Sequence, residues 1–172
     1  NEAPLRDGQP IAPAKLSELR VLPGVPKALE ALKEAGLTLI VVTNQPDVAK
    51  GSISRDEVKA MHEHMRAHLP LDDIKVCYHV DGDRCACRKP KPGMFIEAAQ
   101  EYGIDLRKSF MIGDRWRDIG AGQAAGCHTV LVDYGYREQK PDAPDYVVPS
   151  LVDASPIILS WMGQHPRRMT TP

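Results

Sequence analysis

Three cysteines and a histidine lie within eleven residues of one another, at Cys77, His79, Cys85 and Cys87. Three thiolates and one imidazole complete a tetrahedral zinc shell, which leaves no position open for a reacting water. Cys-x-Cys is a poor spacing for a disulfide, and the interleaved histidine favours a metal over a bridge. The spacing therefore predicts a structural zinc site, with reduced free thiols as the alternative.

Fixed positive charge follows this cluster directly. The run "CRKPKPG" supplies Arg88, Lys89 and Lys91, stiffened by two prolines and placed between a strand-like and a helix-like segment. A basic run is usually a solvated face, but the N-terminus of a helix is suited to anions. Lys89 can act as a point charge on a phosphate, and Arg88 can hold an oxyanion with two hydrogen bonds. The segment therefore indicates an anion site.

Hydroxyl and amide groups end another apolar run. The stretch "VVTNQ" places Thr43, Asn44 and Gln45 where they can hydrogen-bond a phosphate oxygen. On its own the pattern is more often an ordinary polar cap on a strand. It is informative only together with its position in the fold.

A carboxylate stands at the end of a further short apolar run, in "FMIGDRWRD". Asp114 follows Gly113, which leaves room for close approach, and hard cations such as Mg²⁺ prefer oxygen ligands. Asp118 lies about one helical turn further on. It either reaches the water shell of the metal or caps the N-terminus of the helix, and the sequence favours neither role.

The elements that must position these groups alternate between helix and strand. Apolar periodicity predicts helices at residues 24–36, 54–69, 92–103 and 118–126, and strands at 37–44, 74–80, 109–114, 128–135 and 145–150. This alternation is typical of a doubly wound, parallel α/β sheet of the Rossmann-like kind. Ligands bind beyond the carboxyl ends of such strands, which selects residues 43–45, 77–91, 113–115 and Asp133. We expect one domain over residues 1–163 and a polar tail over residues 164–172.

The composition is that of an ordinary globular protein. The formal net charge is −1, with 42% hydrophobic and 26% charged residues, so no general attraction to nucleic acid or to a membrane is expected. The longest apolar run, residues 37–42, is far too short to span a bilayer, and the N-terminus carries no signal-peptide pattern. Clustered reduced thiols favour the cytoplasm. We expect a monomer that acts on a small molecule.

Taken together, the motifs resemble the haloacid dehalogenase superfamily. The matching pieces are "LPGVPKALEALKEAGLTLIVVTNQ", the cysteine cluster with "CRKPKPGM", and "MIGDRWRDIGAG". Within the superfamily they look like the small-cap branch that holds the D-glycero-D-manno-heptose 1,7-bisphosphate phosphatases and the histidinol-phosphate phosphatase domains. The resemblance implies a minimal cap, a zinc-bound loop, a structural Zn²⁺ and a catalytic Mg²⁺.

The resemblance also implies a role for each site residue. Thr43 would orient the phosphoryl group, Lys89 would neutralise charge in the transition state, and Asp114 would bind Mg²⁺. Substrate contacts are implied for Asn44, Gln45, Arg88 and Arg115. The zinc-bound loop would hold Arg88 and Lys89 in advance at the place where the phosphate arrives.

One motif of the superfamily is missing. Its members attack phosphorus with the first aspartate of an Asp-x-Asp-Gly motif at the end of the first strand, and the second aspartate is the general acid and base. Here "LRDG" at residues 5–8 has Leu5 in place of the nucleophile, and no apolar strand precedes it. We expect the chain to begin after that strand, with the nucleophile upstream of Asn1. The alternative is a zinc-stabilised module that binds phosphate without catalysis.

The substrate expected from the resemblance is a small sugar phosphate, above all a heptose 1,7-bisphosphate. The stretch "TNQPDVAKG" is closer to the heptose enzymes. The five residues between the two zinc-ligand pairs are closer to the histidinol-phosphate domain, so histidinol phosphate is the alternative substrate.

Overall fold

The computed structural model describes residues 5–6 and 9–165. The strands are β1 (Leu5–Arg6), β2 (Gln9–Pro10), β3 (Ile40–Asn44), β4 (Asp73–Cys77), β5 (Phe110–Gly113), β6 (His128–Val132) and β7 (Tyr146–Val148). The α-helices are α1 (Val25–Glu34), α2 (Pro46–Ala49), α3 (Arg55–His68), α4 (Gly93–Tyr102), α5 (Trp116–Ala125) and α6 (Leu151–Gln164), with 3₁₀ turns at Leu16–Glu18 (η1), Asp81–Asp83 (η2) and Leu106–Lys108 (η3). None of these helices is long and apolar enough to cross a membrane.

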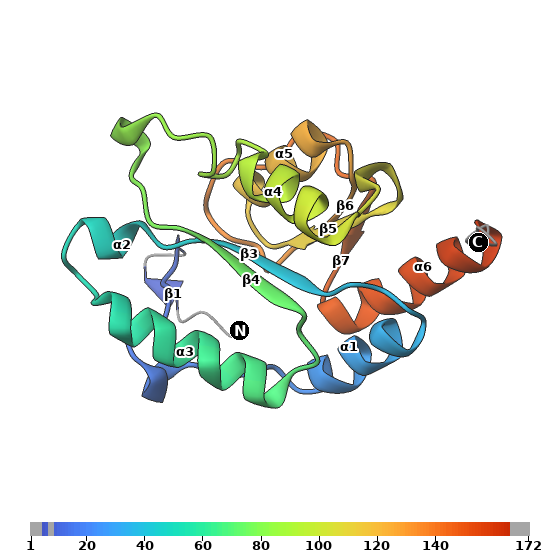
Figure 1. Cartoon of the computed structure of the whole chain (residues 1–172), viewed down its shortest axis with the longest axis horizontal. Helices are drawn as coiled ribbons and strands as arrows, with labels where there is room; N and C mark the ends of the chain where they lie inside the picture. Colours follow the sequence, from blue (N-terminus) through green and yellow to red (C-terminus); the bar gives the residue numbers. More distant parts are fainter. Residues whose placement is uncertain (1–4, 7–8, 166–172) are drawn as a thin grey trace.

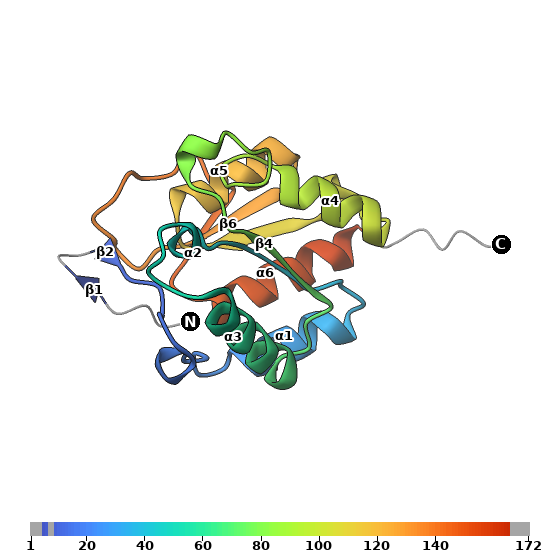
Figure 2. The ribbon, with the colours of Figure 1, turned by 60° about the vertical axis from the view of Figure 1, so that its left-hand side comes forward.

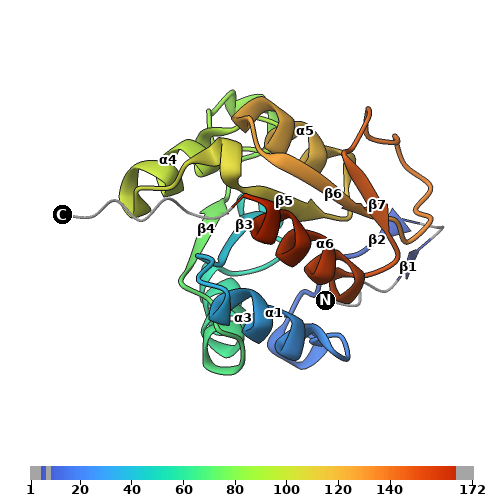
Figure 3. The same cartoon turned by 90° about the vertical axis from the view of Figure 1, so that its right-hand side faces the viewer.

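The main strands are parallel, as predicted, but they form two sheets rather than one. β3 pairs with β4, and β5, β6 and β7 pair in that order, while β1 and β2 form a small antiparallel pair. Helices α4 and α5 cover one face of the strands, and α1, α3 and α6 cover the other (Figures 1, 2 and 3). Within the described residues, the second edge of β3 and the second edge of β5 have no strand partner. The layers are those of a doubly wound α/β fold.

Alternating side chains of β5 hold the layers together. Phe110 and Ile112 pack toward α1 and α6, against a cluster that includes Leu32 and Ile158. Met111, between them in the sequence, packs the other way with Phe95, Ala121 and Cys127, and Val42 of β3 joins this second cluster. Because successive side chains of a strand point to opposite faces, a run as short as β5 serves both helix layers. Cys127, the fourth cysteine of the chain, is buried among apolar groups of this second cluster.

The start of α3 is capped by a serine side chain. Ser54 Oγ accepts a hydrogen bond of 3.0 Å from the backbone N–H of Glu57, which satisfies one free donor of the first turn. A full capping box would have Glu57 accept from Ser54 in return. Instead, Glu57 Oε1 accepts from the backbone N–H of Leu16 at 2.6 Å, and so holds η1 against the helix.

Two helices are absent from the sequence prediction. Short α2 begins at Pro46, two residues after the predicted strand ends at Asn44, and α6 runs for 14 residues with Pro156 inside it. An internal proline normally argues against a helix, because it lacks an N–H donor and crowds the preceding turn. Pro156 is in the second turn of α6, so the carbonyl of Val152, in the first turn, has no helical N–H partner there. Helix α6 includes Gln164, the first residue of the predicted tail, and residues 166–172 lie outside the described residues.

Candidate active site

The carboxyl ends of β3 and β5 lie near the segment that carries Lys89. The side-chain amide of Asn44 makes two hydrogen bonds to the backbone of Lys89. Oδ1 accepts from the Lys89 N–H at 3.1 Å, and Nδ2 donates to the Lys89 carbonyl at 3.2 Å. Next to Asn44, Thr43 Oγ1 accepts from Gln45 Nε2 at 3.3 Å. The structure therefore brings the predicted residues of "VVTNQ" and the basic segment together. It gives Asn44 a positioning contact that the sequence did not predict.

Lys89 is the buried cation of the site, with 7% of its surface exposed. Its Nζ donates to the carbonyl oxygen of Val42 at 2.6 Å and forms an ion pair with Asp118 Oδ1 at 2.6 Å. These contacts use two of the three hydrogens of the ammonium group. One N–H therefore remains for an anion, and the other two fix the direction in which it points.

Asp118 has the capping role that the sequence left open. Its Oδ2 accepts from the backbone N–H of Arg115 at 3.1 Å, at the N-terminus of α5, while Oδ1 holds Lys89. A buried charge needs such compensation, because an unpaired carboxylate in this environment is costly. Each oxygen of the Asp118 carboxylate therefore has a partner within the protein.

Gly113 permits this close approach. A Cβ atom built on Gly113 would lie 2.3 Å from Asp118 Cβ and 2.7 Å from its Oδ2, distances that real side chains do not reach. The glycine therefore allows β5 to end directly against the Lys89–Asp118 pair.

Replacement of Gly113 with alanine is expected to lower the free energy of unfolding by roughly 2–4 kcal/mol, because the new methyl group must push Asp118 away from Lys89. Urea denaturation of the two proteins measures this difference. The matched control is Gly82→Ala, since a Cβ on Gly82 meets nothing within 4 Å. Equal midpoints for the two variants would show that the contact between Gly113 and Asp118 is not constraining.

Asp114 is partly buried and lies beside a second carboxylate, that of Asp118. Burial, and then the charge of Asp118, raise the pKa of Asp114. The hydroxyl of Tyr136 donates to Asp114 Oδ2 at 2.9 Å and acts in the opposite direction. A partly buried carboxylate with too little positive charge around it is a suitable ligand for a hard cation.

Arg115 is engaged by a residue that the sequence did not single out. Glu138 accepts from Arg115 Nε with both carboxylate oxygens, at 2.7 Å each, and its Oε2 also pairs with Nη2. Tyr136 and Glu138 both lie in the connection that follows β6. Sequence reasoning selected Asp133 in this connection, because it follows the strand directly. In the structure, Asp133 accepts from the Gly135 N–H at 2.8 Å and from Lys140, and so stabilises the loop.

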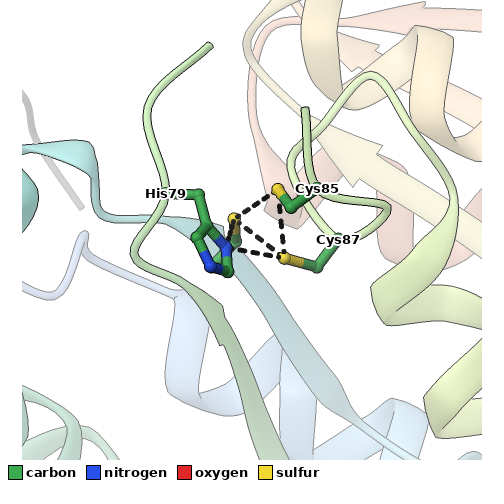
Figure 4. Close-up of side chains that lie close together, drawn as sticks. His79, Cys85 and Cys87 are labelled. Carbon is green, nitrogen blue, oxygen red and sulfur yellow. Dashed lines mark hydrogen bonds between the residues drawn. The ribbon is translucent and has the colours of Figure 1, made fainter. Parts of the chain in front are cut away.

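The Cys/His cluster has the geometry of a four-ligand metal site. The donor atoms of Cys77, His79, Cys85 and Cys87 all lie within 4.8 Å of one another, and His79 directs Nδ1 toward the sulfurs (Figure 4). The sulfur–sulfur distances run from 3.1 to 3.8 Å. Four ligands around zinc, with Zn–S bonds of about 2.3 Å, place the sulfurs about 3.8 Å apart. The residues present therefore fit the ion.

The electrostatics of the cluster also favour a cation. Burial, together with the neighbouring sulfurs of Cys77 and Cys85, raises the pKa of the Cys87 thiol to about 12. Thiolates this close to one another repel, and a divalent cation among them removes that penalty.

The cluster and the basic segment form one structural unit. Lys91 Nζ donates to the carbonyl oxygen of Cys85 at 2.6 Å. A Cβ on Gly93, at the start of α4, would lie 2.4 Å from the carbonyl oxygen of Ala86, so the helix packs directly on the loop. Arg88 Nε donates at 2.8 Å to Asp81, which lies between the two ligand pairs. The position of the ligands therefore fixes the position of the basic side chains.

Arg88 also has a buried nitrogen without a hydrogen-bond partner, Nη1. Buried donors of this kind are rare and call for an acceptor, such as a water or a bound anion.

Asp81, which accepts from Arg88, also accepts from Arg117 at 3.2 and 3.3 Å. This carboxylate therefore connects the loop of the zinc ligands with α5.

Comparison with known proteins shows which phosphatases this chain is similar to. A family model described as HAD-hydrolase-like matches residues 86–154. The D-glycero-β-D-manno-heptose-1,7-bisphosphate 7-phosphatase of Rhodopseudomonas palustris is 36% identical over 147 residues, which are 78% of this chain and 78% of the relative. Its counterpart from Pasteurella multocida is 36% identical over 158 residues, which are 84% of this chain and 86% of the relative.

A solved structure agrees with the sequence relatives. The crystal structure of D,D-heptose 1,7-bisphosphate phosphatase from B. bronchiseptica, complexed with magnesium and phosphate, superposes with a TM-score of 0.76 at 32% identity. The match covers 86% of this chain and 88% of that chain.

Proposed function

The chain belongs to the family of D-glycero-β-D-manno-heptose-1,7-bisphosphate 7-phosphatases, and from this premise we propose that it removes the 7-phosphate of that sugar with the help of Mg²⁺. The family membership confirms the predicted superfamily and the predicted heptose branch. It also favours the heptose bisphosphate over histidinol phosphate as the substrate. The β-anomer is proposed because the names of the similar proteins specify it.

The observation that carries the proposal is the buried Lys89–Asp118 pair beside Asp114. Lys89 presents one free N–H from a position fixed by two contacts, which is how a preorganised donor stabilises charge that develops on a phosphoryl group. Thr43 lies at the end of the neighbouring β3, where its hydroxyl is proposed to orient the phosphoryl oxygens. Asn44, Gln45, Arg88 and Arg115 are proposed to surround the rest of the substrate.

The proposed nucleophile is an aspartate of an Asp-x-Asp-Gly motif, which residues 1–172 do not contain. The unpaired edges of β3 and β5 support a strand between them that ends in this motif. Its first carboxylate would then attack phosphorus between Thr43 and Asp114, and the sugar oxygen would leave with a proton from the second aspartate. Water would hydrolyse the aspartyl-phosphate, with the second aspartate as the base, and release inorganic phosphate.

Two metals complete the proposal. Asp114 is proposed to bind Mg²⁺, which would supply positive charge beside the reacting phosphate. Cys77, His79, Cys85 and Cys87 are proposed to hold a structural Zn²⁺ with no open position. The zinc shell requires reduced thiols, which supports a cytoplasmic enzyme, and the proposed substrate places it in carbohydrate metabolism. We propose a monomer with a small sugar phosphate as its only substrate partner.

Phosphate release tests the proposed function. The protein is assayed with an upstream strand that ends in Asp-x-Asp-Gly, on the β-heptose 1,7-bisphosphate, on its α-anomer and on histidinol phosphate. We expect Mg²⁺-dependent release, with kcat/KM at least about 10-fold higher for the β-anomer than for histidinol phosphate. Faster release from histidinol phosphate would overturn the substrate. A protein made of residues 1–172 alone is the control and is expected to be inactive, because it lacks the nucleophile.

A further inference from the structure

Two side chains of the connection between β6 and β7, Tyr136 and Glu138, contact residues of the candidate site. We call residues 133–140 the site loop; it lies in the long connection that joins these strands in Figure 3. The loop has its own internal support, because Asp133 accepts from the Gly135 N–H and pairs with Lys140 at 3.1 Å, and Gly135 adopts φ of 72°. From this support, Tyr136 and Glu138 extend to two consecutive residues, Asp114 and Arg115.

Tyr136 contacts one oxygen of Asp114. Its hydroxyl donates to Oδ2 at 2.9 Å, and the tyrosine is 7% exposed, so this contact is packed in place. A donor on one oxygen fixes the plane of the carboxylate and leaves Oδ1 to face a cation. Groups that orient a ligand in this way typically contribute 10- to 100-fold to metal affinity.

Glu138 makes the corresponding contact on Arg115. It occupies the side edge of the guanidinium, formed by Nε and Nη2. A guanidinium has five N–H donors on two usable edges, so the end that carries Nη1 stays available for an anion. Arg115 has 39% of its side chain exposed, which means that little else restrains it.

We propose that the site loop positions both halves of the site: Tyr136 sets Asp114 for a divalent cation, and Glu138 sets Arg115 for a phosphate group. Each contact occupies one edge of its partner and leaves the other edge free. Asp114 and Arg115 are neighbours in the chain, and Tyr136 and Glu138, which contact them, are two residues apart on the site loop. One short segment therefore positions both residues. The inference rests on the proposed function for the identity of the ligands, but its tests use Mg²⁺ alone and inorganic phosphate alone.

Tyr136→Phe removes one hydroxyl and keeps the ring. Titration calorimetry of the protein that carries the upstream motif is expected to show Mg²⁺ affinity reduced by roughly 10-fold, with phosphate affinity changed less than about 2-fold. The matched control is Tyr134→Phe, because the Tyr134 ring lies 5.7 Å from that of Tyr136 and is 40% exposed. Unchanged Mg²⁺ affinity in Tyr136→Phe, or the same loss in Tyr134→Phe, would overturn the role of Tyr136.

Glu138→Asp keeps the charge but shortens the side chain by one methylene, so the paired contact with Arg115 is lost. We expect the dissociation constant for inorganic phosphate to rise by roughly 5-fold, because a freed arginine must be ordered again on binding. Mg²⁺ affinity should stay within about 2-fold. A tighter phosphate complex would overturn the proposal, because it would show that Glu138 competes with phosphate for Arg115.

The two variants together separate positioning from general support of the loop. A loop that is only structural would lose both affinities in each variant, in parallel with the melting temperature. A failure of the proposed function has a different signature. In that case the unmodified protein releases no phosphate from the heptose bisphosphate, whatever the two binding titrations show.

Discussion

Replacing Lys89 with alanine is expected to lower kcat for the heptose bisphosphate by roughly 10²-fold or more, with little change in KM. The reason is that the free N–H of Lys89 is aimed by Val42 and Asp118 before the substrate arrives. A donor held in this way acts mainly on charge that appears in the transition state, so its loss appears in turnover. Steady-state kinetics of the two proteins measure the effect.

Arg88→Ala is the variant with which Lys89→Ala is compared, because the two are expected to change different kinetic parameters. Arg88 directly precedes Lys89 in the chain and has a buried nitrogen without a hydrogen-bond partner, so we expect it to hold the part of the substrate that does not react. Its loss should mainly raise KM, and more for the bisphosphate than for a monophosphate. If both variants lose the same parameter equally, or Lys89→Ala keeps near-normal turnover, the segment is only a general basic patch.

A loss of folding must be separated from a loss of catalysis. Lys89→Ala leaves Asp118 as a buried carboxylate without its partner, which typically costs about 3–5 kcal/mol. The double variant Lys89→Ala with Asp118→Asn removes both charges and is expected to recover part of that stability. Its kcat should stay as low as that of Lys89→Ala. Recovery of turnover along with stability would show that Lys89 acts through folding alone.

The helices and strands were predictable where the pattern of apolar residues is strong. Within the predicted helix 54–69, Val58, Met61 and Leu69 are buried, and Gly103, the last residue of the predicted helix 92–103, caps α4 in the left-handed conformation. The split of the strands into two sheets was not predictable from periodicity, because pairing partners are distant in the sequence. Helix α6 was not predicted because Pro156 interrupts the local helical pattern. The helix forms nonetheless, because its apolar side chains pack in one cluster with those of α1.

The candidate site was predictable where one short motif carries a whole contact. The spacing of the zinc ligands brings four donor atoms together within a single loop, and the structure confirms that they meet. Tyr136 and Glu138 could not be found in this way, because they contact Asp114 and Arg115 across more than 20 residues. The usable signal was topological: β6 pairs with β5, so the connection after β6 begins at the sheet edge where Asp114 lies.

Loss of one zinc ligand is expected to have the largest effect on stability. Metal analysis should find about one zinc per chain, and Cys85→Ser should remove most of it. Binding of a structural zinc is coupled to folding and contributes on the order of 10 kcal/mol in small zinc modules. We expect a loss of several kcal/mol here, because the apolar clusters around β5 remain intact without the metal.

The location of the damage distinguishes this role from general destabilisation. Lys91 and Gly93 donate hydrogen bonds to the carbonyl oxygens of Cys85 and Ala86, in the loop that carries the zinc ligands. Loss of the zinc should therefore raise amide hydrogen exchange first over residues 88–93 and later in α3. Cys127→Ser is the matched control: this thiol is buried outside the cluster, so the change should lower stability and leave the zinc content at one. A zinc-free wild-type protein with an unchanged melting temperature would contradict the structural role of the zinc.

Because Arg88 and Lys89 belong to the same segment as the zinc ligands, Cys85→Ser should also lower kcat/KM at temperatures where the protein is still folded.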